Sequence, residues 1–541
     1  MNKNWIRVQA AACVAFVMLF SAACSSKNND NGGASSTDGS TNVSAKTADT
    51  AADPLAKKLK ITAFEGLWGK VLPSDSPGVK AIDEKFNIDY KPEFVPMDQA
   101  QQKIAVLMAS GSQPDILGLE GVDSNFIKWA KQGAFLPLND YIDKYPQLQQ
   151  IPKSIWDSVS VDGKIYGIPQ YFHVKYMNSA VIRKDWLDKL GLPMPSNYDE
   201  LLQVSKAFTE KDPDGNGKAD TYGFSTSKGI DWNNRMGVYY DIGAWYHKNE
   251  QGQLIPGIIS DDANLDRLKF MQDAYAAGTV PKDWPVMEYT DARQVFWSGK
   301  AGIYYEGIPG TGSMWNLLSE NAPDAEVVPI PPFKAPDGSQ GQPGMSGYYT
   351  MKTLSSKLAN DPDKIDRILT MVNQFMTFTP FDQRNPQNEN YDWKQGGVDK
   401  GYTYANGVAD LSGDNDAKVA ARPSTFFTVQ EWAPSDEALE LDKGLKNPKE
   451  AAYAKAVIEE WNKPNYVYID PFSSIHSDVF NEKMGALYDK VMDGETKIIL
   501  GQEPLSYFDT IKADFLKNGG QAIIDDVNKQ IEAVGATGTW K

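Results

Sequence analysis

The chain has 541 residues, of which 41% are hydrophobic and 23% are charged, a composition typical of a soluble globular protein with a substantial core. A chain of this length favours at least two lobes. Its 71 acidic residues outnumber its 54 Lys and Arg, giving a formal net charge of -17. This balance argues against a nucleic-acid-binding protein, which needs a basic surface to neutralise phosphates. Both cysteines, Cys13 and Cys24, lie near the N-terminus, so the folded part has no disulfide framework.

The N-terminus has the features of an export signal. Lys3 and Arg7 precede an apolar run over residues 11–20, which is too short to span a bilayer as a stable helix. We therefore expect a signal peptide that is removed from the mature protein.

The end of this signal predicts a lipid anchor. Small residues precede Cys24 in a pattern similar to the lipobox of bacterial lipoproteins, with Ser21 where Leu is usual. We expect a signal peptide over residues 1–23 and acylation of Cys24, with palmitate among the acyl chains, since several chains anchor a protein stably. A plain secretory signal cut near Ala23 is the alternative.

The next segment, residues 24–56, is interpreted as a flexible tether. Residues 25–52 are almost entirely Ser, Asn, Gly, Asp, Thr, Ala and Lys, and they cannot bury enough apolar surface to fold. A flexible chain of this length has a reach of roughly 30 Å. The remainder, residues 57–541, is expected to form the folded region.

The first folded segments alternate between strand and helix patterns. Apolar runs predict strands over residues 59–64, 88–95 and 114–119, and amphipathic patterns predict helices over 79–86, from a cap at Asp98 onward, and over 126–131. This alternation is typical of a parallel sheet covered on both faces. An Asp-Gly pair predicts a tight hairpin within residues 161–169. Further helices are expected over 186–190 and 198–208, the second capped by Ser196 or Asn197.

The C-terminal third is rich in predicted helices. They are expected over residues 448–461, 480–492, 504–516 and 521–533. By contrast, residues 379–416 are polar and rich in Gly and Asn, and we expect a long loop there with little regular structure.

Five segments together carry a family resemblance. They are residues 103–116 (KIAVLMASGSQPDI), 133–139 (GAFLPLN), 163–169 (GKIYGIP), 183–191 (RKDWLDKLG) and 296–303 (FWSGKAGI). In this order, behind a lipoprotein signal, the chain resembles the extracellular solute-binding proteins of bacterial ABC transporters, in particular the large sugar and oligosaccharide binders of family 1.

The resemblance implies a fold and a function. The fold is α/β, a two-lobed periplasmic-binding-protein-like fold (type II) with discontinuous lobes and a ligand cleft between them, which closes when the ligand contacts both sides. The function is that of a lipid-anchored receptor on the extracellular face of the bacterial cell membrane. It would bind an oligosaccharide derived from a polysaccharide and deliver it to the permease subunits of an ABC importer. We expect a monomer with no enzymatic activity.

A loop over residues 212–223 has the spacing of a calcium site. Oxygen-bearing side chains stand at positions 1, 3, 5 and 9, namely Asp212, Asp214, Asn216 and Asp220. Lys218 would offer its carbonyl and Gly217 would make the sharp turn, but Gly223 replaces the bidentate Glu of a helix-loop-helix site. Similar loops occur in alginate-oligosaccharide-binding members of the resembling family, which carry an acid where this chain has Thr221. We expect a structural Ca²⁺; a solvated turn without an ion is the alternative.

Aromatic and polar clusters provide the candidate ligand contacts. Aromatic rings stack on sugar faces, while amides, guanidinium and carboxylate groups pair with hydroxyls. On these grounds the candidates are Trp232, Asn233, Arg235, Trp245, Glu306, Trp315 and Tyr348. The tryptophans have a plain alternative as core residues, and Arg235 as the partner of a surface acid.

Two other functions remain open at this stage. A peptide receptor on the same fold is one. A secreted glycan hydrolase is the other, because the many Asp and Glu residues leave room for a catalytic carboxylate pair. The chain has no G-x-S-x-G elbow and no P-loop spacing.

Overall fold

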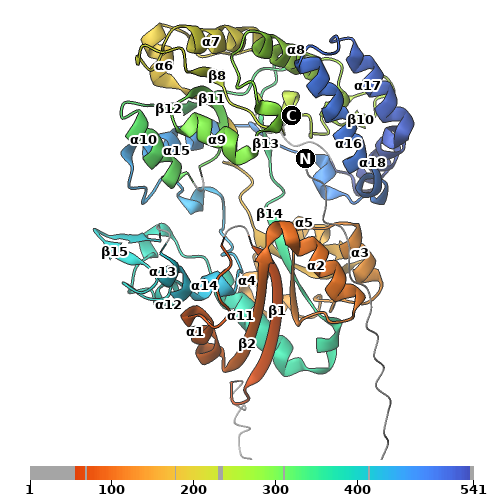
Figure 1. Cartoon of the computed structure of the whole chain (residues 1–541). Helices are drawn as coiled ribbons and strands as arrows, with labels where there is room; N and C mark the ends of the chain where they lie inside the picture. Colours follow the sequence, from red (N-terminus) through yellow and green to blue (C-terminus); the bar gives the residue numbers. More distant parts are fainter. Residues whose placement is uncertain are drawn as a thin grey trace, which may run out of the picture. The chain divides into compact units, whose positions relative to one another are not determined.

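Two β-sheets, each with its own hydrophobic core, organise the folded region (Figure 1). The computed structural model describes residues 55–67, 70–176, 178–228, 235–308, 311–411 and 415–536. The predicted signal peptide, Cys24 and nearly all of the tether lie outside the described residues.

The first sheet has the strand order β2-β1-β3-β14-β6. Its strands are β1 (Leu59–Leu67), β2 (Ile88–Pro96), β3 (Ile116–Leu119), β6 (Gly167–Tyr171) and β14 (Tyr348–Leu354). β1 is parallel to β2 and β3, which confirms the predicted parallel arrangement, whereas β14 runs antiparallel to both β3 and β6. The carboxyl ends of β1, β2, β3 and β6 and the amino end of β14 therefore meet at one edge of the sheet.

Helices from both ends of the lobe's sequence pack around this sheet. They are α1 (Pro77–Phe86), α2 (Met97–Ala109), α3 (Ser124–Lys131) and α11 (Pro362–Met376). α1 begins with a proline in its first turn and ends at Asn87, whose left-handed φ of 47° closes the helix. α2 begins at Met97 after Pro96, so the predicted cap at Asp98 is wrong: position 98 already lies in the first turn.

The second sheet has the order β12-β7-β11-β8. Its strands are β7 (Ser179–Arg183), β8 (Tyr222–Phe224), β11 (Ala301–Glu306) and β12 (Val327–Pro329), and only the β8–β11 pair is parallel. The surrounding helices include α6 (Lys184–Leu190), α7 (Tyr198–Glu210), α8 (Ala263–Ala276), α9 (Tyr289–Trp297) and α10 (Gly312–Asn321). The Asn197 side chain caps α7 by accepting a hydrogen bond from the Glu200 N–H, which settles the two predicted alternatives.

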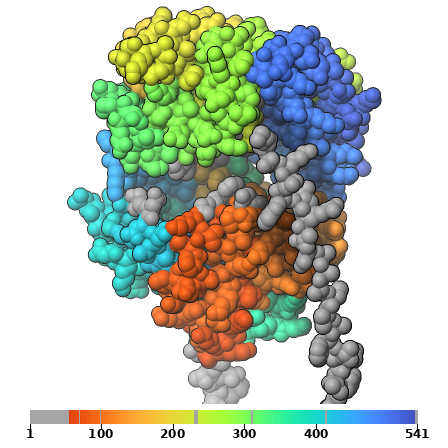
Figure 2. All heavy atoms as spheres, in the orientation of Figure 1, coloured from red at the N-terminus to blue at the C-terminus, as the bar shows by residue number. Residues whose placement is uncertain are grey.

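The chain passes between the two cores three times. One core draws on residues from Leu59 to Ile168 and from Met351 to Trp432. The other draws on residues from Tyr176 to Phe333 and from Tyr453 to Ile531. Each lobe is therefore discontinuous in sequence. In Figure 2 the surface of the first folded residues, in red and orange, adjoins the cyan surface near residue 400, in line with the ion pair between Lys70 and Asp416.

The helix-rich C-terminal third is confirmed. It contains α15 (Pro448–Trp461), α16 (Asp478–Ile499), α17 (Tyr507–Phe515) and α18 (Gln521–Val534), all packed into the second core. A fully buried ion pair between Arg267 of α8 and Glu495 of α16 joins this bundle to the lobe. Among the described residues, no helix has the length and apolar character needed to cross a membrane.

The segment expected to be one long loop contains regular structure instead. It holds a 3-10 turn (Phe381–Gln383), α12 (Glu389–Lys394) and a ribbon of β15 (Thr403–Ala405) and β16 (Val408–Asp410). The expectation was wrong because a few large side chains are enough to stabilise regular structure in a polar segment. Tyr391 and Tyr402 are buried against each other, and the Asn388 side chain caps α12.

Short elements complete the fold. The predicted Asp-Gly hairpin is confirmed by β4 (Ser160–Val161) and β5 (Lys164–Ile165), joined through Asp162 and Gly163, both at positive φ. The other short elements are α4 (Pro146–Gln149), α5 (Lys153–Ser158), α13 (Asp416–Ala421), α14 (Pro423–Phe426), β9 (His247–Lys248), β10 (Leu254–Ile255), β13 (Gln342–Gly344) and β17 (Val467–Ile469).

Candidate functional site

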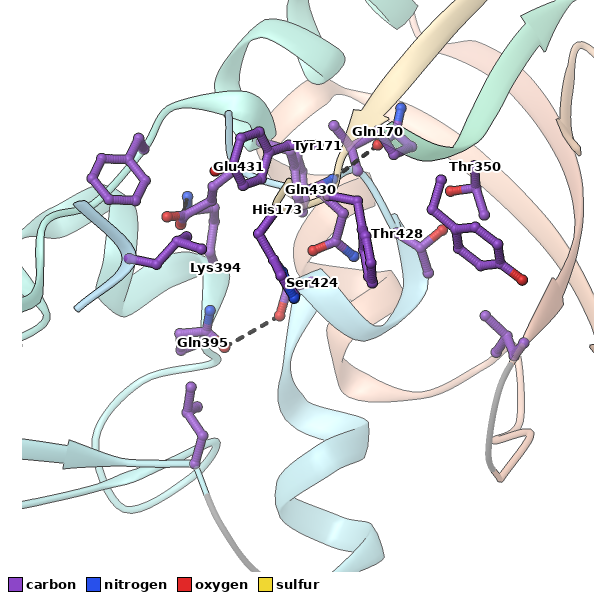
Figure 3. A pocket seen from close by; sticks show the side chains of 18 of the residues that line it. Gln170, Tyr171, His173, Thr350, Lys394, Gln395, Ser424, Thr428, Gln430 and Glu431 are labelled. Carbon is purple, nitrogen blue, oxygen red and sulfur yellow. Dashed lines mark hydrogen bonds and ion pairs between the residues drawn. The ribbon is translucent and has the colours of Figure 1, made fainter. Parts of the chain in front are cut away.

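A cavity of about 720 Å³ opens at the carboxyl edge of the first sheet (Figure 3). Its floor comes from residues at the end of β1, from residues 170–173 at the end of β6, and from Tyr349 and Thr350 at the start of β14. The walls come from the end of α11, from α12 and from residues 424–441. Ligands of open α/β sheets bind outside the carboxyl ends of the strands, and the volume lies within the roughly 300–1,000 Å³ typical of small-molecule sites.

Aromatic rings provide much of the apolar lining. They belong to Tyr171, Phe172, Tyr349, Phe375, Phe378 and Tyr391. The Phe172 ring stacks on His173 with centroids 4.5 Å apart and lies 5.7 Å from the Tyr349 ring. Phe172 and Tyr349 are only partly buried, so each keeps exposed ring surface.

A buried ion pair lies beneath the cavity. Glu65 at the end of β1 pairs with Lys352 of β14, and the Thr428 hydroxyl contacts both side chains. Burial lowers the pKa of Lys352, and the neighbouring carboxylate of Glu65 opposes that shift. The two charges of this pair neutralise each other. Through Thr428, the pair links the sheet to the segment that follows α14.

A second ion pair, between Lys394 of α12 and Glu431, also belongs to the lining. Glu431 also accepts hydrogen bonds from the Thr379 N–H at 2.9 Å and the Thr379 hydroxyl at 3.3 Å. The carbonyl of Thr379 accepts a hydrogen bond from Nε of Arg384 at 3.1 Å. Burial lowers the pKa of Lys394, and the positive charge of Arg384 adds to that shift.

Polar side chains complete the lining. The buried Gln170 accepts a hydrogen bond from the Gln430 N–H at 2.9 Å, and the Ser424 hydroxyl donates to Gln395 at 3.2 Å. His173 is 8% exposed, its Nε2 has no hydrogen-bond partner among the residues that the structure describes, and burial lowers the pKa of its imidazole. The cavity therefore combines rings, amides and a buried imidazole, with both lining carboxylates already held in ion pairs.

The sequence-predicted ligand contacts that the structure describes do not line this cavity. Trp232 and Asn233 lie outside the described residues. The guanidinium of Arg235 is 3.2 Å from Asp241, and Glu306 is buried, where it pairs with Arg293 at 2.6 Å and accepts a hydrogen bond from the Trp297 indole.

The remaining candidates lie in or against the cores. Trp245 and Trp315 are each 1% exposed, and Trp245 stacks on Phe472. The structure places both in the second core, because large rings are favoured wherever they fill interior volume. Tyr348 packs against the first core, and the adjacent Tyr349 lines the cavity instead. The pairing of β14 with β6 is irregular between Tyr348 and Met351, so simple strand alternation does not predict which side chains reach the cavity.

The predicted calcium loop is compact and polar. Asp212 accepts hydrogen bonds from the N–H groups of Asn216 and Gly217, and the Asn216 amide donates to Asp214 at 2.7 Å and Asp220 at 3.1 Å. One oxygen of Asp220 pairs with Lys300 at 2.5 Å. In the described part of the chain, no three His, Cys, Asp or Glu side chains are grouped so that they could hold a metal ion.

Two residues at the end of the loop, Thr221 and Gly223, restrict which groups could complete the coordination of a calcium ion. The Thr221 hydroxyl donates to the carbonyl of Phe208 at 2.8 Å and is buried. Gly223 belongs to β8, where a Cβ atom would lie 2.5 Å from Ser205 of α7. Position 12 of the loop thus packs against a helix, where a longer side chain would clash.

The cavity residues were missed by sequence reasoning for a clear reason. Gln170, Tyr171 and Phe172 follow directly on the segment GKIYGIP, and Tyr349 follows the candidate Tyr348, so weak signals existed. Arg384, Lys394 and Glu431 fall within or beyond the polar segment expected to be a loop, and nothing in their spacing connects them to β1.

The sequence and the site together define the class of the protein. A family profile described as bacterial extracellular solute-binding protein matches residues 71–357, more than half of the chain. The chain belongs to this family and is a solute-binding receptor, not an enzyme.

Two curated relatives resemble most of the chain. Lipoprotein LipO of Bacillus subtilis (strain 168) is 28% identical over 472 residues, which cover 84% of this chain and 89% of that protein. The polygalacturonan/rhamnogalacturonan-binding protein YtcQ of the same strain is 27% identical over 485 residues, covering 87% and 90%.

Solved structures share the fold. FusA of Streptococcus pneumoniae in complex with kestose has a TM-score of 0.62 at 19% identity, covering 88% of this chain and 99% of that one. A FusA EF-hand mutant in complex with fructo-nystose has a TM-score of 0.61 at 20% identity and the same coverage. These likenesses confirm the two-lobed α/β architecture.

Proposed function

We propose that this protein is the lipid-anchored receptor of an ABC importer and that it binds an oligosaccharide in the cavity at the carboxyl edge of the first sheet. The cavity is the observation that carries the proposal. Its exposed ring surfaces at Phe172 and Tyr349 suit the apolar faces of sugar rings, and its amides suit hydroxyl pairs. The second lobe closes on the ligand and completes the site.

The relatives support this substrate class. YtcQ is named for binding polygalacturonan and rhamnogalacturonan, and FusA is named for fructooligosaccharides. The two ligands differ in composition and charge, yet both are carbohydrates built from several sugar units. Peptide binding is the remaining alternative on the same architecture.

A single aromatic truncation tests the site. Phe172→Ala removes a ring that lines the cavity without belonging to the buried core. Loss of a stacked ring at a binding hot spot costs about 2 kcal/mol or more, so affinity for the oligosaccharide should fall at least about tenfold by calorimetry.

A matched control separates binding from stability. Tyr141→Ala removes a partly buried ring that packs against the same core but does not line the cavity. It should lower the melting temperature and leave affinity unchanged. Equal affinities of the wild type and Phe172→Ala would place the binding site elsewhere.

We also propose that the loop over residues 212–223 binds a structural Ca²⁺. Support comes from the donor set, since three carboxylates and one amide oxygen suit a hard cation, and from FusA, for which an EF-hand mutant is described. Binding requires the Asn216 amide to turn its oxygen inward. Either the ion pair between Asp220 and Lys300 must break, or the calcium ion must bind the other carboxylate oxygen of Asp220.

The proposal also covers the lipid anchor, the protein partners and the location of the receptor. Cys24 is the acylated residue, the permease subunits of the importer are the protein partners, and the receptor works as a monomer on the extracellular face of the cell membrane. LipO, which is named a lipoprotein, supports the anchor.

A further inference from the structure

One charged side chain in the described lining of the cavity has no ion-pair partner. Among the described residues that line it, the charged or titratable side chains other than tyrosines are Glu65, His173, Arg384, Lys394 and Glu431. Glu65 is neutralised by Lys352 and Glu431 by Lys394, and burial lowers the pKa of the His173 imidazole against the opposing effect of the Asp436 charge. The guanidinium of Arg384 is the remaining charge.

Only one nitrogen of the Arg384 guanidinium, Nε, is hydrogen-bonded to a described residue. Its Nε donates to the carbonyl of Thr379 at 3.1 Å, and its guanidinium lies 5.9 Å from the centre of the Phe381 ring. Within the described residues, Nη1 and Nη2 have no hydrogen-bond partner and no carboxylate lies within ion-pair distance. The Arg384 side chain is partly buried and lines the cavity, so its N–H donors are only partly hydrated.

Two carboxylates next to the lining are held by hydrogen bonds to its tyrosines. Asp436 accepts from the Tyr171 hydroxyl at 2.6 Å, and Glu120 accepts from the Tyr349 hydroxyl.

Two acids on the elements near Arg384 are also engaged elsewhere. The carboxylate of Asp392 on α12 accepts hydrogen bonds from the Tyr402 hydroxyl at 2.8 Å and from the Val398 N–H at 3.2 Å. Asp410 of β16 pairs with Lys446. Two arginines of the second lobe differ from Arg384 in this respect, since Arg235 pairs with Asp241 and Arg293 with Glu306.

From this uncompensated guanidinium we infer that the cavity selects an acidic oligosaccharide, with the carboxylate of a uronic acid unit held by Nη1 and Nη2 of Arg384. A planar guanidinium binds a carboxylate through two parallel N–H···O bonds, and the exposed rings nearby accept the face of the sugar that carries it. The partly dehydrated cavity strengthens this pairing, even though the whole chain carries a net charge of -17. The inference rests on the proposed function.

Trigalacturonic acid and its methyl ester provide a matched pair of probes. The two share their sugar rings and linkages and differ in the carboxylate charge. At a fixed calcium concentration, calorimetry on the wild type should show the acid binding at least about tenfold more tightly than the ester, and this preference should shrink as salt is raised.

Variants assign the preference to Arg384. Arg384→Gln should remove most of the affinity for the acid and little of that for the ester. Arg384→Lys should keep part of the preference, because a lysine retains the charge without the paired donors. Lys80→Gln removes the same charge from an exposed site on α1 outside the cavity and should leave both affinities unchanged.

The outcomes separate the two proposals. Equal binding of the acid and the ester by the wild type, or equal weakening of both in Arg384→Gln, would overturn the role of Arg384 and leave an oligosaccharide receptor. If neither probe binds and neutral oligosaccharides also fail, the proposed function itself is wrong. Should Arg384→Gln not fold, the comparison of acid and ester on the wild type, at low and high salt, still decides the question.

Discussion

Asp470 shows how a single buried carboxyl makes the fold sensitive to pH. It begins a 3-10 turn (Pro471–Ser474) and accepts hydrogen bonds from the Phe472 N–H at 2.9 Å and, across the lobe, from the Trp245 N–H at 2.8 Å. Burial raises the pKa of Asp470 to about 6. The two N–H donors favour the charged form but do not offset the loss of hydration.

The direction of the pH effect follows from this raised pKa. The native state binds a proton more tightly than the unfolded chain, so the contribution of Asp470 to stability is complete below its unfolded pKa of 3.8 and is lost as the pH rises through about 6. Relative to Asp470→Asn, the wild type should therefore gain about 2 kcal/mol between pH 7 and pH 4.

Denaturant unfolding of both proteins at the two pH values measures this difference. The comparison uses the change with pH, so any constant loss from the substitution cancels. A wild-type advantage that is the same at pH 4 and pH 7 would mean that Asp470 titrates normally in the native state.

At the scale of elements, the loop between α7 and β8 should respond to calcium. Asp212, Asp214 and Asp220 place three carboxylates on one loop, and a cation bound by all three would offset their repulsion. A ligand that binds only the native state stabilises it by about 3 kcal/mol at a hundredfold excess over its Kd. Calcium should raise the melting temperature of the wild type, and chelator should lower it.

Two variants locate that effect. Asp214→Asn removes one carboxylate from the loop and should abolish most of the calcium response. Asp157→Asn removes a carboxylate from an exposed ion pair with Lys153 on α5 and should respond to calcium as the wild type does. The same calcium response in both variants would assign the ion to another site or to none.

Elements were predicted better than the site, for physical reasons. Strand β1 and helix α15 depend on local periodicity, which the sequence displays directly. The region of α12 lacks such periodicity because a few contacts between distant residues, such as Tyr391 with Tyr402, stabilise it. Trp245 is buried in a core and Tyr349 lines the cavity. This difference depends on contacts made only in the folded lobe, and local sequence patterns do not predict it.

At the scale of the whole molecule, a single cysteine should decide where the protein resides. Cys24→Ala should release the receptor from the cell membrane into the medium, since acyl chains at that residue are its proposed attachment. Cell fractionation and blotting measure the shift. Cys13→Ala, which changes a residue of the signal peptide, should leave the protein on the membrane.

The anchor assignment has two ways to fail. A Cys24→Ala protein that stays on the membrane would show that something else holds it there. A wild-type protein found free in the medium would favour a plain secretory signal cut near Ala23.

The most direct test of the central claim is to titrate the whole protein with oligosaccharides and then recover the ligand. An oligosaccharide should saturate one site per chain, with affinity lowered by Phe172→Ala, and chromatography should return it uncleaved after long incubation. Shortened sugars in the recovered ligand would indicate a hydrolase. Saturable binding of peptides, with no binding of any oligosaccharide, would contradict the account of the site and its substrate class.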